Sequence, residues 1–448
     1  MRGSCVAAAG AIALTLLAGC SLGREETATD PASDALDARL AETFRIDVSE
    51  LDVTYDFWPR GSRIRGSAVL RFKMRPGQTR PLFHFNPIRH AAGPERAMLR
   101  SLELDGEPLD PLDEEDLRRV RPLRSGEPAF EVQRELAPSD AHTLRASWSI
   151  PTRDLRAPPG QFYTNFDDTI GPKNETEAWW PTISSPEELA RHRIHLRVHG
   201  DRRYTVLGSG VIRRRDAAGV QAWDLDTERP VASHTVMFAA VPSDQVRTAQ
   251  FDASGVEVRI VSDRSPAIMK RARAITRRTI ARLLDDFGPF PMPSMQILLT
   301  GWGGGMEYYG ATRTGIGALE HELVHMYFGT ATVNRTWRDI WFDEAVVEWW
   351  QRRDRLAPLR PGFKSDIVGG RSVVQPGFDE AAYGNGARIF GEIARALGGN
   401  REMIAFLADL HRRRAFEPFT TDDFIDDVVA AQSKIDRAEL ERWLFATR

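Results

Sequence analysis

Two short stretches of the chain, HELVH at residues 321–325 and WFDEA at residues 341–345, carry its strongest structural signal. His321 and His325 are four positions apart, so on a helix both imidazoles project from one face at the separation that a single zinc ion requires. The first stretch therefore predicts a helix that presents two metal ligands. This pentapeptide alone would arise by chance in roughly one in a hundred chains of similar size, so it needs support from other residues.

The second stretch supplies a candidate third ligand. Glu344 follows His325 by 19 positions, and the apolar run after it predicts a second helix with Asp343 as its N-cap. Two histidines and one glutamate leave the fourth position of a tetrahedral zinc ion open, as in catalytic rather than structural sites. The alternative is a pair of surface histidines and a first-turn glutamate that favours the helix dipole. The spacing favours one zinc ion per chain, held by His321, His325 and Glu344.

The hydrophobic pattern changes near the middle of the chain. Residues 64–74 alternate apolar and polar side chains as a β-strand does, and similar signals continue to about Val246. Ser265 and Pro266 then suit the start of a helix that continues to Asp286, and most later segments have helical spacing. The pattern predicts an α+β protein, with an N-terminal β-sandwich followed by a mainly helical region.

The composition is that of a globular protein large enough for two domains. With 448 residues, 42% of them hydrophobic, the chain has more apolar material than one compact core uses. A formal net charge of -3 gives no general attraction to polyanions. The arginine runs at 213–215 and 412–414 lie near acidic residues and are typical of solvated faces. We therefore expect no nucleic-acid partner.

The first 20 residues have the pattern of an export signal. Arg2 precedes a short run of small and apolar residues that ends in Leu17-Ala18-Gly19-Cys20. This run is too short to span a bilayer comfortably as a helix. The tetrapeptide resembles the lipobox of bacterial lipoproteins, in which the cysteine is acylated after cleavage in front of it. We expect a lipoprotein signal peptide at residues 1–19 and a lipidated Cys20, and an ordinary secretory signal is the alternative.

The segment after the expected cleavage site, residues 20–43, is mostly polar and predicts a tether. Cys5 and Cys20 are the two cysteines of the chain, and Cys5 would leave with the signal, so no disulfide is expected. A zinc ion in this protein would then need histidine and carboxylate ligands. Ser21 resembles the residue found in lipoproteins sorted to the outer membrane. The expected location is the bacterial cell envelope, with a lipid anchor in the outer membrane or on the periplasmic face.

A wider set of residues resembles the aminopeptidase N family of gluzincin zinc metallopeptidases. The resemblance rests on H-E-x-x-H at 321–325 with Glu344 after 18 further residues, and on Gly304-Gly305-Met306-Glu307, which resembles the family's G-x-M-E-N motif. Residues 383–387, YGNGA, are similar to its Y-x-K-G-A segment. Tyr308 and Asn385 depart from these motifs. The resemblance runs from about residue 44 to the C-terminus, where the sequence resembles the end of the catalytic domain, and it implies a short form without the family's C-terminal helical domain.

The resemblance implies an architecture and two catalytic roles. The β-sandwich domain would occupy residues 44–246, and a thermolysin-like, mainly helical zinc peptidase domain would occupy residues 247–448. Glu322 would act as the general base toward the attacking water. Tyr383 would stabilise the oxyanion, and a packed helical tyrosine is the alternative for this residue.

The same resemblance implies how a peptide substrate would be held. Glu307 would bind the α-ammonium group of the substrate. Gly304, Gly305 and Met306 would also contact the substrate, and the two glycines let the backbone approach a bound peptide closely. The alternative for Glu307 is a charged residue on an exposed edge strand.

The expected function is therefore that of a zinc metallopeptidase that removes N-terminal residues from peptides. Two alternatives stay open: a non-catalytic envelope lipoprotein that uses a peptidase fold as a scaffold, and an endopeptidase on the same zinc scaffold. Glu322 argues against the scaffold, because metal binding alone does not require this residue.

Overall fold

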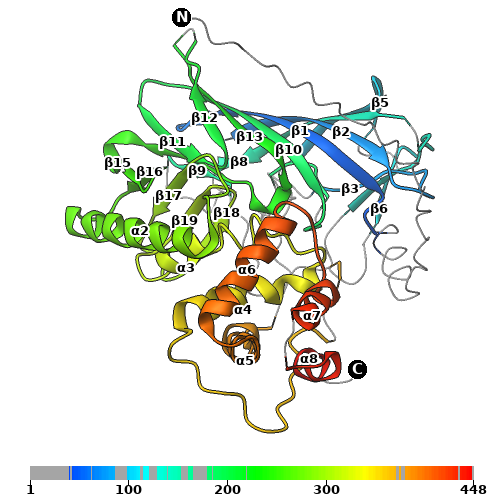
Figure 1. The fold of residues 1–448 in the computed structure, drawn as a ribbon. Coiled ribbons are helices and arrows are strands. Elements are labelled where there is room, and N and C mark those ends of the chain that lie inside the picture. The colour runs from blue at the N-terminus through cyan, green and yellow to red at the C-terminus, as the bar shows by residue number, and fades with distance from the viewer. Residues whose placement is uncertain are drawn as a thin grey trace, which may run out of the picture. The chain divides into compact units, whose positions relative to one another are not determined.

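The computed structural model describes residues 40, 43–61, 63–85, 98–110, 115–120, 129–138, 140–152, 160–164, 179–183, 185–217, 219–369, 373–374, 379–431 and 434–445. The signal peptide, Cys20 and nearly all of the tether lie outside these residues. The chain from Arg39 to Arg448 forms one compact unit. It has a sheet-rich N-terminal region and a C-terminal region with most of the helices, so the expected α+β class is confirmed (Figure 1). The domain boundary at residues 246 and 247 stays a prediction.

The largest sheet has eight strands in the order β12-β13-β10-β1-β2-β8-β4-β5. β1 and β10 are parallel, and the other neighbouring strands are antiparallel. In β1 and β2, buried and exposed residues alternate, so one face of the sheet packs into a core and the other carries charges. The strand expected over residues 64–74 is thus confirmed as β2. The bounds are β1 (Ile46–Phe57), β2 (Arg63–Met74), β4 (Met98–Leu104), β5 (Glu107–Leu109), β8 (His142–Pro151), β10 (Leu189–Val198), β12 (Val211–Arg214) and β13 (Gln221–Ala232).

Two smaller sheets accompany the large one, with strand orders β11-β14-β9 and β3-β7-β6. The ring of Tyr55 in β1 packs against Phe162 of β9 and Phe238 of β14, with centroids 5.2 and 5.5 Å apart. These aromatic contacts join two sheets face to face, which is the layered packing expected of a β-sandwich. The bounds are β3 (Leu82–His84), β6 (Leu117–Val120), β7 (Ala129–Val132), β9 (Phe162–Tyr163), β11 (Tyr204–Gly208) and β14 (Phe238–Pro242), with short helical turns η3 (Ser233–Thr235) and η4 (Ser243–Gln245) beside β14.

Charged side chains on the outward face of the large sheet pair across its strands. His195 of β10 lies between Asp52 of β1 and Asp224 of β13, at Nε2–Oδ1 and Nδ1–Oδ1 distances of 3.2 and 2.8 Å. The hydrogen bond to Asp52, reinforced by Asp224, raises the pKa of His195 to about 9. All six arginines of the two arginine runs likewise pair with carboxylates of this chain.

The C-terminal region begins with a five-stranded sheet in the order β15-β16-β17-β19-β18. Helix α2 (Pro266–Phe287) follows β16, with the Ser265 hydroxyl accepting from the Ile268 amide and Gly288 at the C-cap, as the sequence predicted. α2 contacts β15, β16 and α3, and α3 contacts β18 and β19 (Figure 1). The bounds are β15 (Arg247–Ala253), β16 (Val256–Ser262), β17 (Met295–Leu299), β18 (Gly305–Tyr308), β19 (Ala311–Thr314) and α3 (Leu319–Val324).

The remaining helices follow α3. They are η5 (Trp337–Ile340), α4 (Trp341–Arg352), the π-helical turn η6 (Ala382–Gly386), α5 (Ala387–Leu397), α6 (Asn400–Arg414), α7 (Thr421–Ala430) and α8 (Arg437–Leu444). The expectation that Asp343 caps α4 is wrong. The chain enters a helical turn earlier, at η5, where Thr336 and Asp339 form a reciprocal capping box. Asp343 lies inside the first turn of α4, where its Oδ1 accepts from the Glu344 amide at 2.8 Å. None of the helices that the structure describes is long and apolar enough to cross a membrane.

Candidate metal centre

The first two candidate ligands lie at the end of a short, buried helix. His321 is in α3, and His325 follows its last residue with backbone angles that are still helical. Leu319 and Leu323 of this helix are fully buried. The helix ends here because the Thr330 hydroxyl donates to the His325 carbonyl at 2.9 Å and caps an acceptor that a longer helix would satisfy.

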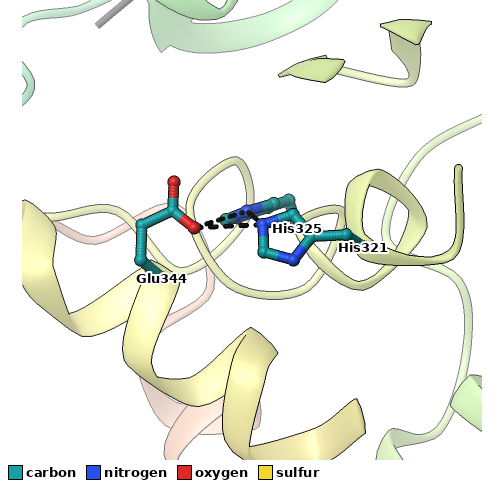
Figure 2. Close-up of side chains that lie close together, drawn as sticks. All are labelled: His321, His325 and Glu344. Atoms are coloured by element: carbon teal, nitrogen blue, oxygen red, sulfur yellow. Dashed lines mark hydrogen bonds and ion pairs between the residues drawn. The ribbon is translucent and has the colours of Figure 1, made fainter. Parts of the chain in front are cut away.

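The two imidazoles and the Glu344 carboxylate converge on one point. Nε2 of His321 lies 3.0 Å from Nε2 of His325 and 3.0 Å from Oε2 of Glu344. Nε2 of His325 lies 3.5 Å from the same Glu344 oxygen. Figure 2 shows the three side chains reaching toward one another from α3 and α4. The predicted ligand set is therefore brought together in space, although its residues span 23 positions of sequence.

Hydrogen bonds on the far side of each imidazole decide whether this set suits a metal ion. Nδ1 of His325 lies 3.0 Å from the Phe328 carbonyl oxygen, and Nδ1 of His321 lies 3.2 Å from Oε1 of Gln351. Both oxygens only accept, so each Nδ1 can donate to them, and a bound metal ion would take the lone pair of each Nε2. Two lone pairs and a carboxylate oxygen would repel one another at these distances without a cation between them. The donor set therefore fits zinc, with the outer hydrogen bonds fixing the tautomers.

Tyr383, from the π-helical turn η6, contacts the third ligand. Its hydroxyl donates to Oε1 of Glu344 at 3.0 Å, the oxygen that does not face the histidines. The burial of Glu344 opposes its ionisation, but His325 and His321 lower its pKa below the ordinary range. The carboxylate thus stays charged beside the two imidazoles. The role of Tyr383 toward an oxyanion stays a prediction.

Glu322 lies beside the metal ligands and lines the same cavity. Its side chain is buried, and among the residues that the structure describes Oε2 has no hydrogen-bond partner. Burial, together with the nearby carboxylate of Glu307, raises the pKa of Glu322 to about 8. A buried carboxyl group that lacks a partner is costly to fold unless it serves a purpose, so this atom is a candidate for contact with water or substrate.

Gly305 makes room for the carboxyl group of Glu322. The sequence did not reveal this proximity. A Cβ placed on Gly305 would come within 2.1 Å of Oε1 of Glu322, and its three nearest atoms would all belong to that side chain. A Cβ on Gly303 would meet nothing within 4 Å. That Gly304 and Gly305 let the backbone approach a bound peptide stays a prediction, and the structure shows in addition that Gly305 faces Glu322.

Glu307 lies on the edge strand β18, whose alternation sets its direction. Met306 and Tyr308 are buried in a cluster that includes Leu207 and Met237 of the sheet-rich region. Glu307 points to the other side, where Oε1 lies 3.9 Å from Nδ1 of His325. Burial raises the pKa of Glu307. Its carboxylate is thus held near the candidate metal ligands by a strand anchored in the core.

One cavity of about 380 Å³ contains every site residue that the sequence singled out in the described part of the chain. These are Gly304, Gly305, Met306, Glu307, His321, Glu322, His325, Glu344 and Tyr383. Trp302 and Gln351 also line the cavity and were not recognised from sequence. Gln351 lies two helical turns after Glu344, so helical spacing was a signal that could have found it. Glu348, one turn after Glu344, has Oε1 3.7 Å from Nδ1 of His321 and accepts from Arg352 at 3.0 Å.

The fold matches solved structures of zinc peptidases. The M1 zinc metallopeptidase from Deinococcus radiodurans is 19% identical and aligns with a TM-score of 0.66 over 89% of this chain and 94% of its own. Yeast LTA4 hydrolase is 14% identical, with a TM-score of 0.66 over 90% and 68% of the two chains. Legionella pneumophila aminopeptidase A, solved with aspartic acid, is 14% identical, with a TM-score of 0.70 over 90% and 49%. A variant of the Deinococcus enzyme has been solved with a Tyr-Ser-Ala substrate.

No family model and no curated protein matches this sequence. At these identities the structural likeness shows the fold, and that fold is the one of the M1 zinc metallopeptidases.

Proposed function

We propose that this chain is a zinc-dependent aminopeptidase that removes N-terminal residues from peptides. The observation that carries the proposal is the convergence of the two Nε2 atoms on the Glu344 carboxylate. In the same cavity lies Glu322, whose Oε2 has no hydrogen-bond partner among the described residues. Structural neighbours support it, since their names describe zinc metallopeptidases and an aminopeptidase, and one of them binds a tripeptide substrate.

Each polar side chain of the cavity has a distinct task in this proposal. A zinc ion bound by the three ligands would polarise the scissile carbonyl and lower the pKa of the attacking water. Glu322 accepts the proton of that water and returns it to the leaving amine. Tyr383 turns from Glu344 and donates a hydrogen bond to the developing oxyanion, an interaction commonly worth about 3 kcal/mol. Glu307 binds the α-ammonium group through charge-assisted hydrogen bonds.

The recognition of the α-ammonium group separates an aminopeptidase from an endopeptidase. The carboxylate of Glu307 lies on a rigid strand near the ligands, so it can fix the first residue of a peptide with its carbonyl at the metal position. A non-catalytic scaffold would need neither this carboxylate nor Glu322. These two residues therefore favour the exopeptidase over both alternatives.

The test combines metal analysis with blocked and unblocked substrates. The purified protein is expected to hold about one zinc ion per chain, to cleave the tripeptide Tyr-Ser-Ala, and to leave its N-acetyl form intact. Glu307→Ala should keep zinc and lose most of the activity on the free peptide. Equal cleavage of the two peptides would establish an endopeptidase, and absence of cleavage at full zinc occupancy would favour the scaffold.

We also propose that the protein is anchored to the bacterial envelope through Cys20. The support is the lipobox-like sequence Leu17-Ala18-Gly19-Cys20 after a short apolar run. Acylation with more than one chain gives a stable membrane anchor.

A further inference from the structure

Trp302 is an exposed aromatic residue at the candidate active site. It lies between β17 and β18, three residues before Gly305, and its exposed fraction is 39%. Only one other large hydrophobic side chain in the described part of the chain, Val429 of α7, is as exposed. Trp302 lines the cavity of the metal ligands, so its exposed surface is available to whatever occupies that cavity. A single exposed apolar side chain is common on protein surfaces, so the significance of Trp302 lies in its position at this cavity.

The segment that carries Trp302 lies beside β19, and a residue of that strand lies near its indole. The guanidinium of Arg313 in β19 lies 5.4 Å from the Trp302 ring and 4.6 Å from the ring of Tyr163 in β9. Nε of Arg313 has no hydrogen-bond partner among the described residues, so cation–π contacts with these two rings help to stabilise the guanidinium. A Cβ on Gly315, the residue after β19, would come within 1.9 Å of the Trp302 carbonyl oxygen, so the backbone of the segment packs closely beside the end of that strand. These contacts hold the backbone of Trp302 and place a cation beside its indole.

A second cavity lies next to Trp302. It has a volume of about 330 Å³, and its walls include Val241, Leu298, Arg313 and Trp302 itself. Trp302 thus lines both this space and the cavity of the metal ligands. It can act either as a surface on which a ligand packs or as a barrier that keeps large groups out, and these roles predict opposite effects of its removal.

We propose that Trp302 is the residue that recognises the side chain of the substrate's N-terminal residue, and that it selects aromatic and large apolar side chains by packing against them. This inference rests on the proposed aminopeptidase function. In that function the α-ammonium group binds Glu307 and the carbonyl lies at the metal ligands, so the first side chain branches from the atom between them. Trp302 precedes Glu307 by five residues and lines the same cavity, so its indole is an apolar surface within that space.

The charges of the cavity favour an apolar side chain over a basic one. The described lining residues include four glutamates, and the proposed function gives a role to three of them. Glu344 belongs to the metal ligands, Glu322 to the attacking water and Glu307 to the α-ammonium group, while Glu348 pairs with Arg352. Arg313 adds positive charge beside the indole, so a lysine or arginine side chain gains little from cation–π attraction there.

The experiment measures selectivity and binding in the zinc-loaded full chain. Wild type is expected to cleave phenylalanyl and leucyl p-nitroanilides with higher kcat/KM than alanyl and lysyl p-nitroanilides. Trp302→Ala should lower the phenylalanyl-to-alanyl ratio about three- to tenfold, the range expected for a lost aromatic contact. Trp302→Phe should retain most of the ratio. Val429→Ala, which removes the other exposed hydrophobic side chain far along the sequence, is the matched control and should leave the ratio unchanged.

Calorimetry with free amino acids provides a readout that does not depend on turnover. Trp302→Ala should weaken the binding of L-phenylalanine and leave the binding of L-alanine as it is in wild type. Arg313→Met should also weaken the binding of L-phenylalanine, but less than Trp302→Ala does. Arg313→Lys should bind L-phenylalanine as wild type does, because it retains the cation beside the indole.

Two results would overturn the inference: an unchanged phenylalanyl-to-alanyl ratio in Trp302→Ala, or a higher ratio, which would make Trp302 a barrier to the second cavity. Failure of the proposed function has a different signature, because wild type at full zinc occupancy would then cleave none of the free-amine substrates. In that case the calorimetric comparison still decides the role of Trp302.

Discussion

Gly305→Ala is expected to disable the proposed general base without disturbing the fold. The added methyl group would lie 2.1 Å from Oε1 of Glu322, whereas ordinary contacts begin at 3.4 Å. The carboxyl group must therefore recede by about 1.3 Å, and a misplacement of about 1 Å in a catalytic group can cost roughly 100-fold in rate. We expect kcat to fall about 100-fold, which corresponds to about 2.7 kcal/mol of transition-state stabilisation.

The fold should tolerate this substitution. The φ of Gly305 is outside the left-handed region, and the atoms in the way belong to the end of a flexible side chain. The free energy of unfolding should therefore change by less than about 1 kcal/mol, because alanine also reduces the entropy of the unfolded chain. Zinc content should remain at about one ion per chain, since none of the three ligands is displaced.

The assay is kcat on a free-amine peptide, with zinc content and urea unfolding measured on the same preparations. Gly303→Ala is the matched control, because a methyl group there meets nothing within 4 Å and should leave kcat unchanged. In a Glu322→Ala background the clash disappears, so Gly305→Ala should cost no further activity. Wild-type turnover in Gly305→Ala, or an equal loss in Gly303→Ala, would refute the placement of Glu322.

Three further predictions address other parts of the chain. Gln351→Leu should weaken zinc binding about 10- to 100-fold in a competition with a chelator, because Nδ1 of His321 loses its acceptor; unchanged affinity would show that this hydrogen bond is dispensable. Cys20→Ser should release the protein from membranes in cell fractionation, and retention after an alkaline wash would count against the anchor. Because the pKa of His195 is raised from 6.5 to about 9 in the fold, its protonated form contributes stability that is fully present below pH 6.5 and is lost as pH rises through about 9. The midpoint of thermal unfolding should therefore fall between pH 6.5 and 9 more in wild type than in His195→Gln. Parallel pH profiles would contradict the pairing with Asp52.

Patterns in the sequence predicted the elements that depend on neighbouring residues or on a restricted set of residue types. The alternation in residues 64–74 predicted a strand because one face of it is buried, and β2 confirms it. Ser265 and Pro266 predicted the start of α2 because capping uses adjacent residues. The histidine pair and Glu344 could be assembled because zinc restricts both the types of ligand and their number.

The contacts that the sequence did not reveal join residues far apart in the chain. Gln351 meets His321 over 30 positions, and Tyr383 meets Glu344 over 39. Helical spacing relates Gln351 to Glu344 within α4, but it does not report the contact of Gln351 with His321 or of Tyr383 with Glu344, because these contacts depend on how α4 and η6 pack after the helices form. The wrong N-cap of α4 has a different origin. The capping box that starts η5 was present in the sequence, but Asp343 stood closer to the apolar run.

The central claim is that Glu322 is the general base of a zinc peptidase, and Glu322→Gln tests it most directly. Zinc content and kcat on a free-amine peptide should be measured together, with Glu320→Gln as the matched control on the same helix, since Glu320 does not line the cavity and pairs with Arg282. We predict about one zinc ion per chain in both variants. The rate of Glu322→Gln should fall about 10²- to 10⁴-fold, because an amide cannot accept the proton of the attacking water. Turnover close to wild type in Glu322→Gln with zinc retained would contradict the account.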